Sequence, residues 1–126
     1  MQPSKPAVWS GRALTALPVA FMIFDATIKF VHPQVVTEAS QRIGFPDSLN
    51  VALGVIVLIG LALYLVPRTA VLGAVLLTGY LGGAVAIHAR IFDPLFSHTL
   101  FPVYVGAMFW AGLALRDVRV RQLIAG

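Results

Sequence analysis

The sequence contains no cysteine and few charged residues, and each shortage excludes a class of chemistry. Without cysteine the chain has no structural disulfide, no thiol–disulfide exchange and no cysteine-ligated iron–sulfur cluster. Charged residues make up only 11% of the 126 residues, whereas soluble globular domains carry about 25%. Because 59% of the residues are hydrophobic, the chain has too little polar surface to cover a soluble fold. The composition therefore indicates an integral membrane protein, and its length indicates one domain spanning residues 1–126.

Four apolar runs have the length of membrane-spanning helices: residues 13–31, 49–66, 70–89 and 99–115. About 20 helical residues cross a hydrocarbon core of about 30 Å, and lipid forces the backbone polar groups to pair within the helix. The sequence therefore predicts an all-α, membrane-spanning four-helix bundle. The short link at residues 67–69 makes the second and third helices antiparallel neighbours, and Ser97 is expected to cap the fourth.

A short amphipathic segment separates the first two runs. Within residues 33–43, the apolar side chains Val35, Val36, Ala39 and Ile43 share one side, and the polar side chains Thr37, Glu38, Gln41 and Arg42 share the other. Gly44 and Pro46 then supply a stop signal. We expect a short helix that lies in the membrane interface and covers the outer mouth of the bundle.

Basic residues are unevenly distributed between the two predicted sides of the membrane. One side has Lys5, Arg12, Arg68, Arg116, Arg119 and Arg121, and the other has Lys29, Arg42 and Arg90. This asymmetry predicts that both termini of the multi-pass chain are cytoplasmic. The same residues form no basic patch, so the expected partner is the lipid bilayer and not a nucleic acid.

Ionisable side chains recur in the outer half of the predicted bundle. Asp25 and Lys29 share a helix face at a spacing of four, acid first, which is the favourable order for an ion pair. Asp25 lies about 18 Å past the inner end of its helix, where an ionisable group costs about 2.5–3.5 kcal/mol unless it faces protein or water. His88 and Tyr104 fall at comparable depths on other helices. The candidate ligand-binding residues are Asp25, Lys29, Tyr80, His88, Arg90, Tyr104 and His98.

Three interpretations of these polar residues remain open. Asp25 and Lys29 can serve only to lock helix packing, with Lys29 and Arg90 extending toward the interface. The residues can instead line a pocket for a small ligand, or carry a proton or ion path, although the inner half offers few polar residues for one. The spacing of His88, Asp93 and His98 matches no standard metal site, and His88 has no facing haem ligand. We therefore expect no metal and no cofactor.

Small and aromatic residues are assigned packing roles. Gly79 and Gly83 form a G-x-x-x-G pair that is typical of close helix contact. Trp9, Tyr64 and Trp110 are interpreted as anchors at the membrane interface.

Three segments resemble the DoxX-like family: Gly79–Arg90 (GYLGGAVAIHAR), Asp93–His98 (DPLFSH) and Phe101–Tyr104 (FPVY). The ending Trp110–Asp117 and the first helix, with its late Asp25 and Lys29, are also similar. The resemblance implies a small four-helix protein of the bacterial inner membrane. Founding relatives are subunits of a thiosulfate:quinone oxidoreductase, and distant animal relatives assist receptor assembly. A redox role here would need a partner subunit, because the chain has no flavin, haem or cysteine motif.

These observations predict an accessory or small-molecule-binding membrane protein with a polar pocket in its outer half. The ligand would be a small hydrophobic, quinone-like or lipid-derived molecule, and a second copy or a partner membrane subunit would be a further partner. The alternative is a membrane enzyme, or a subunit of a redox complex, that acts on such a molecule. In that case Asp25 or His88 would be the acid or base, and Lys29 or Arg90 would hold an anion.

Overall fold

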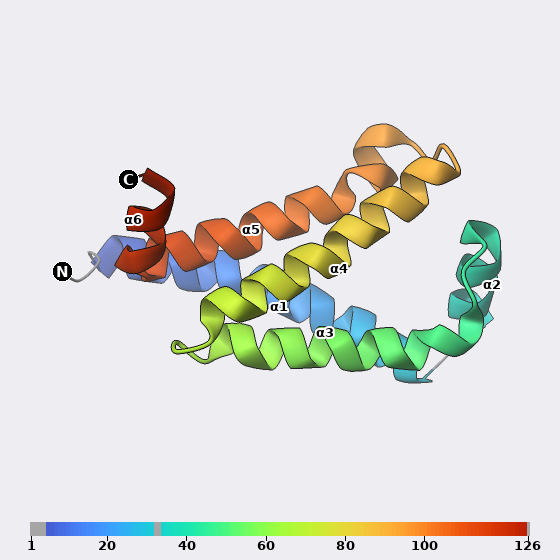
Figure 1. Cartoon of the computed structure of the whole chain (residues 1–126), viewed down its shortest axis with the longest axis horizontal. Coiled ribbons are helices and arrows are strands. Elements are labelled where there is room, and N and C mark those ends of the chain that lie inside the picture. The colour runs from blue at the N-terminus through green and yellow to red at the C-terminus, as the bar shows by residue number, and fades with distance from the viewer. Residues whose placement is uncertain (1–4, 32–33, 126) are drawn as a thin grey trace.

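The computed structural model describes residues 5–31 and 34–125, which form helices joined by short links (Figure 1). Its four long helices are α1 (Lys5–Val31), α3 (Asn50–Leu65), α4 (Ala70–Arg90) and α5 (Phe101–Arg116). The shorter elements are α2 (Gln34–Ile43), α6 (Val118–Ala125), the 3-10 turn η1 (Asp47–Leu49) and the π-helical turn η2 (Leu95–Thr99). The predicted all-α fold is confirmed.

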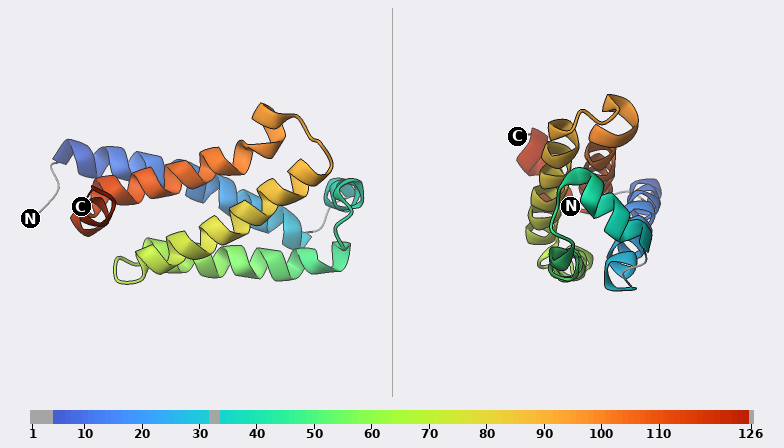
Figure 2. Two further views of the ribbon diagram at one scale, coloured as in Figure 1. Left: turned by 45° about the horizontal axis from the view of Figure 1, so that its top comes forward. Right: turned by 90° about the vertical axis from the view of Figure 1, so that its right-hand side faces the viewer.

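The four long helices pack in a ring, in which α1 and α4 each contact both α3 and α5. α1 runs from the end of the bundle that holds the termini to the end that holds α2, and α3 runs back in the opposite direction. Successive long helices are therefore antiparallel (Figures 1 and 2). Both described ends of the chain therefore lie at one end of the bundle. We call this the terminal end, and the opposite end, where α2 lies, the α2 end.

The helix boundaries follow the predicted apolar runs, with two differences. α1 begins at Lys5, well before residue 13. α5 begins at Phe101 because residues 95–99 form a separate π turn, and its N-cap position is Leu100, without a side-chain cap. The expected cap at Ser97 is wrong, since its hydroxyl instead lies 2.8 Å from His98 Nδ1.

Among the described residues, three segments are long and apolar enough to cross a membrane: Val8–Val31, Ala70–Arg90 and Leu95–Arg116. α3 is equally apolar but has only 16 residues, which is slightly below the usual spanning length. Large apolar side chains such as Leu17, Phe24 and Ile59 are exposed on the outer faces of the bundle. A bilayer would remove these surfaces from water.

α2 forms the expected amphipathic helix across the α2 end (Figure 1). Val36 is buried and Glu38 is exposed. Gly44, at φ 69°, ends the helix in a Schellman motif, with its N–H bonded to the Gln41 carbonyl and the Phe45 N–H bonded to the Ser40 carbonyl. Pro33, where the predicted segment begins, lies outside the described residues, as does the side chain of Val35.

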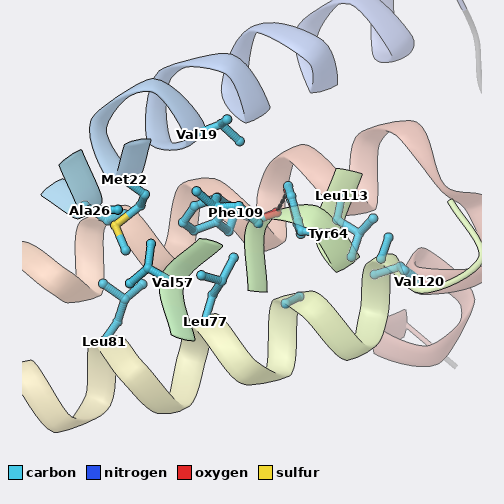
Figure 3. Packing of buried hydrophobic residues seen from close by; sticks show 14 residues of the cluster. Val19, Met22, Ala26, Val57, Tyr64, Leu77, Leu81, Phe109, Leu113 and Val120 are labelled. Carbon is cyan, nitrogen blue, oxygen red and sulfur yellow. Dashed lines mark hydrogen bonds between the residues drawn. The ribbon is translucent and has the colours of Figure 1, made fainter. Parts of the chain in front are cut away.

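The apolar core lies along the bundle axis and includes Tyr64, which is fully buried (Figure 3). Its hydroxyl donates to the Phe109 carbonyl, and its ring meets the Phe109 ring edge-on with 5.0 Å between centroids. The expectation that Tyr64 anchors the interface is therefore wrong. Trp9 is 66% exposed, whereas Trp110 is partly buried and donates to the Thr78 hydroxyl.

Helix backbones lie close together near the terminal end. A Cβ at Gly73 of α4 would lie 2.7 Å from the Gly60 carbonyl oxygen of α3 and even closer to the Tyr64 backbone. A Cβ at Gly11 of α1 would lie 2.9 Å from the Gly112 carbonyl oxygen of α5. From the α3–α4 link, α3 and α4 diverge toward the α2 end (Figure 1).

The G-x-x-x-G pair, Gly79 and Gly83, does not lie at a close helix contact. A Cβ at Gly79, Gly82 or Gly83 would have no neighbouring atom within 4 Å. The expectation that Gly79 and Gly83 bring helices together is therefore wrong within this chain. These glycines leave α4 with open space beside it.

Gly73→Ala is expected to destabilise the protein by about 1–3 kcal/mol, because the added methyl forces the α3 and α4 backbones apart. Gly82→Ala is the matched control on the same helix, and it should be neutral or slightly stabilising because Ala favours helix over Gly. Thermal unfolding of both variants in the same detergent compares them. Equal melting temperatures would contradict the close α3–α4 contact.

Candidate ligand-binding site

A cavity of about 820 Å³ occupies the α2 end of the bundle. It lies between α1, α3 and α4, reaches the start of α5, and has α2 along one side. In the end-on view of Figure 2, α2 lies in front of the space between the long helices. Most of the wall is apolar and includes Phe21, Met22, Ile56, Leu76, Ile87 and Val105. Gly79 and Gly83 belong to the same wall, so their missing side chains add to its volume. We call this the α2-end cavity.

A carboxylate, an ammonium group and a phenol meet in one wall of the α2-end cavity. Asp25 Oδ2 accepts hydrogen bonds from Lys29 Nζ at 2.8 Å and from the Tyr80 hydroxyl at 3.1 Å. The predicted Asp25–Lys29 ion pair is therefore confirmed, and its side chains are 23% and 12% exposed. Among the described residues, Asp25 Oδ1 receives no hydrogen bond and Lys29 donates only to Asp25. The cluster thus retains both an acceptor and donors for a ligand.

The same cavity contains a second polar contact, which was not predicted from the sequence. Asn50 Nδ2 donates to Ser40 Oγ at 2.9 Å, and both residues are buried. The sequence contains a feature that could have indicated each of these two residues. Ser40 follows Val36 by four residues and precedes Ile43 by three, which places it on the inward face of α2. Asn50 is an amide at the start of an otherwise apolar helix, where a polar group needs a protein partner.

Three charged or polar residues join α2 to the link that follows α4. Arg42 holds Asp93 with two hydrogen bonds, Nη1–Oδ1 at 2.6 Å and Nη2–Oδ2 at 3.1 Å. His88 Nδ1 forms a hydrogen bond with the same carboxylate. The left-handed backbone of Phe92 (φ 56°), directly before Asp93, turns the chain back toward His88. The hydrogen bonds with Arg42, which is the larger cause, and with His88 hold the pKa of Asp93 well below its usual range. Asp93 therefore stays ionised at physiological pH.

A second arginine also fastens α2. Arg90 Nη2 donates to the carbonyl of Ile43, the last residue of α2. Arg42 extends from α2 to the link after α4, and Arg90 extends from α4 to the last residue of α2. α2 is therefore held at two points, and these contacts keep it beside the cavity.

The structure brings together four of the seven candidate residues. Asp25, Lys29, Tyr80 and His88 all line the α2-end cavity. The other three do not line it. Arg90 bonds to α2, as described above. Tyr104 is exposed and donates to the Phe96 carbonyl at 2.9 Å, and His98 is exposed beside Ser97.

The His88 and His98 rings are 6.5 Å apart, yet the described residues contain no group of three or more His, Asp or Glu side chains arranged to hold a metal ion. The cavity wall itself supplies hydrogen-bonding groups. It offers Lys29 as a cation, Asp25 as an acceptor and His88 as an imidazole oriented by a carboxylate.

Helices of spanning length with apolar outer faces define the chain as an integral membrane protein. The model of the DoxX-like family matches residues 13–112, which include every residue that lines the α2-end cavity. The chain belongs to the DoxX-like family. Comparison with curated proteins and with solved structures gave no match.

Asp25→Asn and Lys29→Met are each expected to destabilise the protein by about 1–3 kcal/mol, because each leaves a partly buried charge without its partner. The double variant should be more stable than either single variant, since it removes both charges. Thr27→Val, at an exposed residue between them on α1, is the control and should change stability little. Unfolding in detergent measures all four. Additive losses in the double variant would show that the two charges are not coupled.

Proposed function

We propose that this DoxX-like protein is a non-catalytic membrane protein that binds one small amphipathic molecule in the α2-end cavity. The observation that carries the proposal is the cavity itself, which combines about 820 Å³ of space with a largely apolar wall and one polar cluster. Small-molecule sites have this composition, and their volumes usually fall between about 300 and 1,000 Å³. A cavity of this size also argues against a role for Asp25 and Lys29 in packing alone.

The groups in the wall favour a quinone-like or lipid-derived ligand. A carbonyl or hydroxyl head can accept a hydrogen bond from the Lys29 ammonium group, and a hydroxyl head can also donate one to the unused oxygen of Asp25. An apolar ring or short chain would then lie along α4 beside Gly79 and Gly83. The two arginine attachments of α2 would retain the ligand, and their release would give it access from the interface.

The proposed topology has four membrane spans. α1 ends at the α2 end and α4 begins at the terminal end (Figure 1), so α3 must cross whatever those two helices cross. The 3-10 turn η1 directly precedes α3 and extends it. The excess of Lys and Arg at the terminal end supports cytoplasmic termini in a bacterial inner membrane.

Reporter fusions test this topology directly. A fusion at residue 126 is expected to report the cytoplasm, and an insertion within residues 35–45 is expected to report the opposite side. Three predicted spans separate the two sites, so signals from the same side would mean that an even number of helices crosses between them, as would follow if α3 does not cross.

One observation favours a membrane enzyme as a second candidate function. His88 lines the cavity, and its Nδ1 bonds to Asp93. If Nδ1 carries the proton, Nε2 is a free acceptor that can act as a base. Mass spectrometry of a short-chain ubiquinone recovered after incubation separates the two functions. An unchanged probe supports binding alone, and a modified probe that His88→Gln abolishes supports an enzyme.

Gly83→Leu is expected to weaken binding of the short-chain ubiquinone by about tenfold or more, which corresponds to about 1.4 kcal/mol. The leucine side chain would enter the open space beside Gly83 in the α2-end cavity. Gly82→Leu adds the same side chain to the adjacent position, which does not line the cavity, and should bind the probe normally. Native mass spectrometry measures both affinities. Equal binding by the two variants would place the probe outside this cavity.

A further inference from the structure

A second cavity, of about 450 Å³, lies at the terminal end. α1, the link between α3 and α4, and the end of α5 surround it. Its charged side chains are Arg12, Arg116 and Asp117, and its apolar ones include Leu65 and Leu113. We call this the terminal cavity. It is separate from the α2-end cavity and shares no lining residue with it.

Two guanidinium groups of the terminal cavity lack a carboxylate partner. The Arg12 guanidinium lies over the Trp9 ring, 5.0 Å from its centroid, and that of Arg116 lies 4.7 Å from the centroid of the Tyr64 ring. Neither forms an ion pair among the described residues. Stacking on an aromatic face leaves the N–H groups at the edge of a guanidinium available for an anion.

The one carboxylate of the terminal cavity is already engaged. Asp117 Oδ2 pairs with Arg119 Nη2 at 3.1 Å, and its Oδ1 accepts from the Arg119 backbone N–H at 2.9 Å. These hydrogen bonds hold the pKa of Asp117 below its usual value. Arg119 therefore neutralises Asp117, and the charges of Arg12 and Arg116 remain unbalanced.

Two buried polar atoms of the terminal cavity also lack hydrogen-bond partners within the part of the chain that the structure describes. They are Arg116 Nε and the hydroxyl oxygen of Thr15, a residue that is only 8% exposed. A buried donor without a partner destabilises the folded protein. An anion in the cavity would supply the acceptor for Arg116 and balance both guanidinium charges.

We propose that the terminal cavity binds the phosphate of an anionic phospholipid through Arg12 and Arg116. Arginine pairs match the geometry of phosphate oxygens, and basic pockets between membrane helices are recognised sites for lipid head groups. A lipid is favoured over free phosphate because the cavity also has an apolar wall, and exposed Leu65 continues it onto the outer face of α3. α6 lies across the same end (Figure 1), with Val120 buried and Leu123 exposed, as in an interfacial helix.

The full-length protein in a neutral detergent is titrated with dioleoyl phosphatidylglycerol or dioleoyl phosphatidylcholine, and bound lipid is counted by native mass spectrometry. Wild type is expected to prefer phosphatidylglycerol, and Arg12→Gln with Arg116→Gln should weaken that binding by about tenfold or more. Arg12→Gln alone should weaken it measurably, and because Arg12 is exposed this variant tests the site without disturbing the core. Arg68→Gln removes an exposed charge at the same end that does not line the cavity, and it should change binding less than twofold.

Three results would overturn the proposal. Equal binding of the two lipids by wild type would mean that no anion site exists. An equal loss in Arg68→Gln would mean that general surface charge, and not the cavity, attracts the lipid. Displacement of phosphatidylglycerol by millimolar inorganic phosphate, dependent on Arg12 and Arg116, would assign the site to free phosphate.

Discussion

The close contact between the α3 and α4 backbones at Gly60 and Gly73 determines where these helices can separate. Any side chain at Gly73 would overlap the α3 backbone, so these helices are held together at the terminal end. Gly11 and Gly112 do the same for α1 and α5. Helices fixed closely at one end and tilted relative to each other must separate at the other. The α2-end cavity is the space that this separation leaves.

The polar groups of the cavity follow from that geometry. A carboxylate at the depth of Asp25 must face protein or water, and the diverging helices give it Lys29 on the same helix and Tyr80 on α4. The cluster remains incompletely paired because the neighbouring wall consists of glycine and apolar side chains. α2, attached through Arg42 and Arg90, then determines how the cavity meets the interface. The same tilt therefore explains the space, the unused hydrogen-bonding groups and the need for a covering helix.

Features that depend on position along one helix could be predicted from the sequence. The apolar runs, the Asp25–Lys29 pair and the amphipathic α2 are of this kind, because they depend on composition and on local periodicity. Features that depend on how helices rotate and tilt could not be predicted. Tyr104 was placed by depth alone, but the π turn at residues 95–99 changes the phase of the chain before α5, and the side chain faces outward.

The glycines illustrate the same limit. Gly79 and Gly83 fit a packing motif, whereas Gly60 and Gly73 fit none, yet only the second pair lies at a close contact. Nothing in a single sequence states which side of α4 faces a neighbouring helix. The expectation for Tyr64 was wrong for a related reason. An aromatic residue near a helix end can anchor the interface or fill the core, and the packing of α3 against α5 decides between these two roles.

The proposed ligand site can be observed directly in an experimental structure of the protein in a lipid nanodisc. We expect close backbone contact at Gly60 and Gly73, separated helices at the α2 end, and density for a small molecule whose polar end meets Asp25, Lys29 and Tyr80. A structure in which α1 or α3 packs directly against Gly79 and Gly83, with no space beside the Asp25–Lys29 pair, would contradict this expectation.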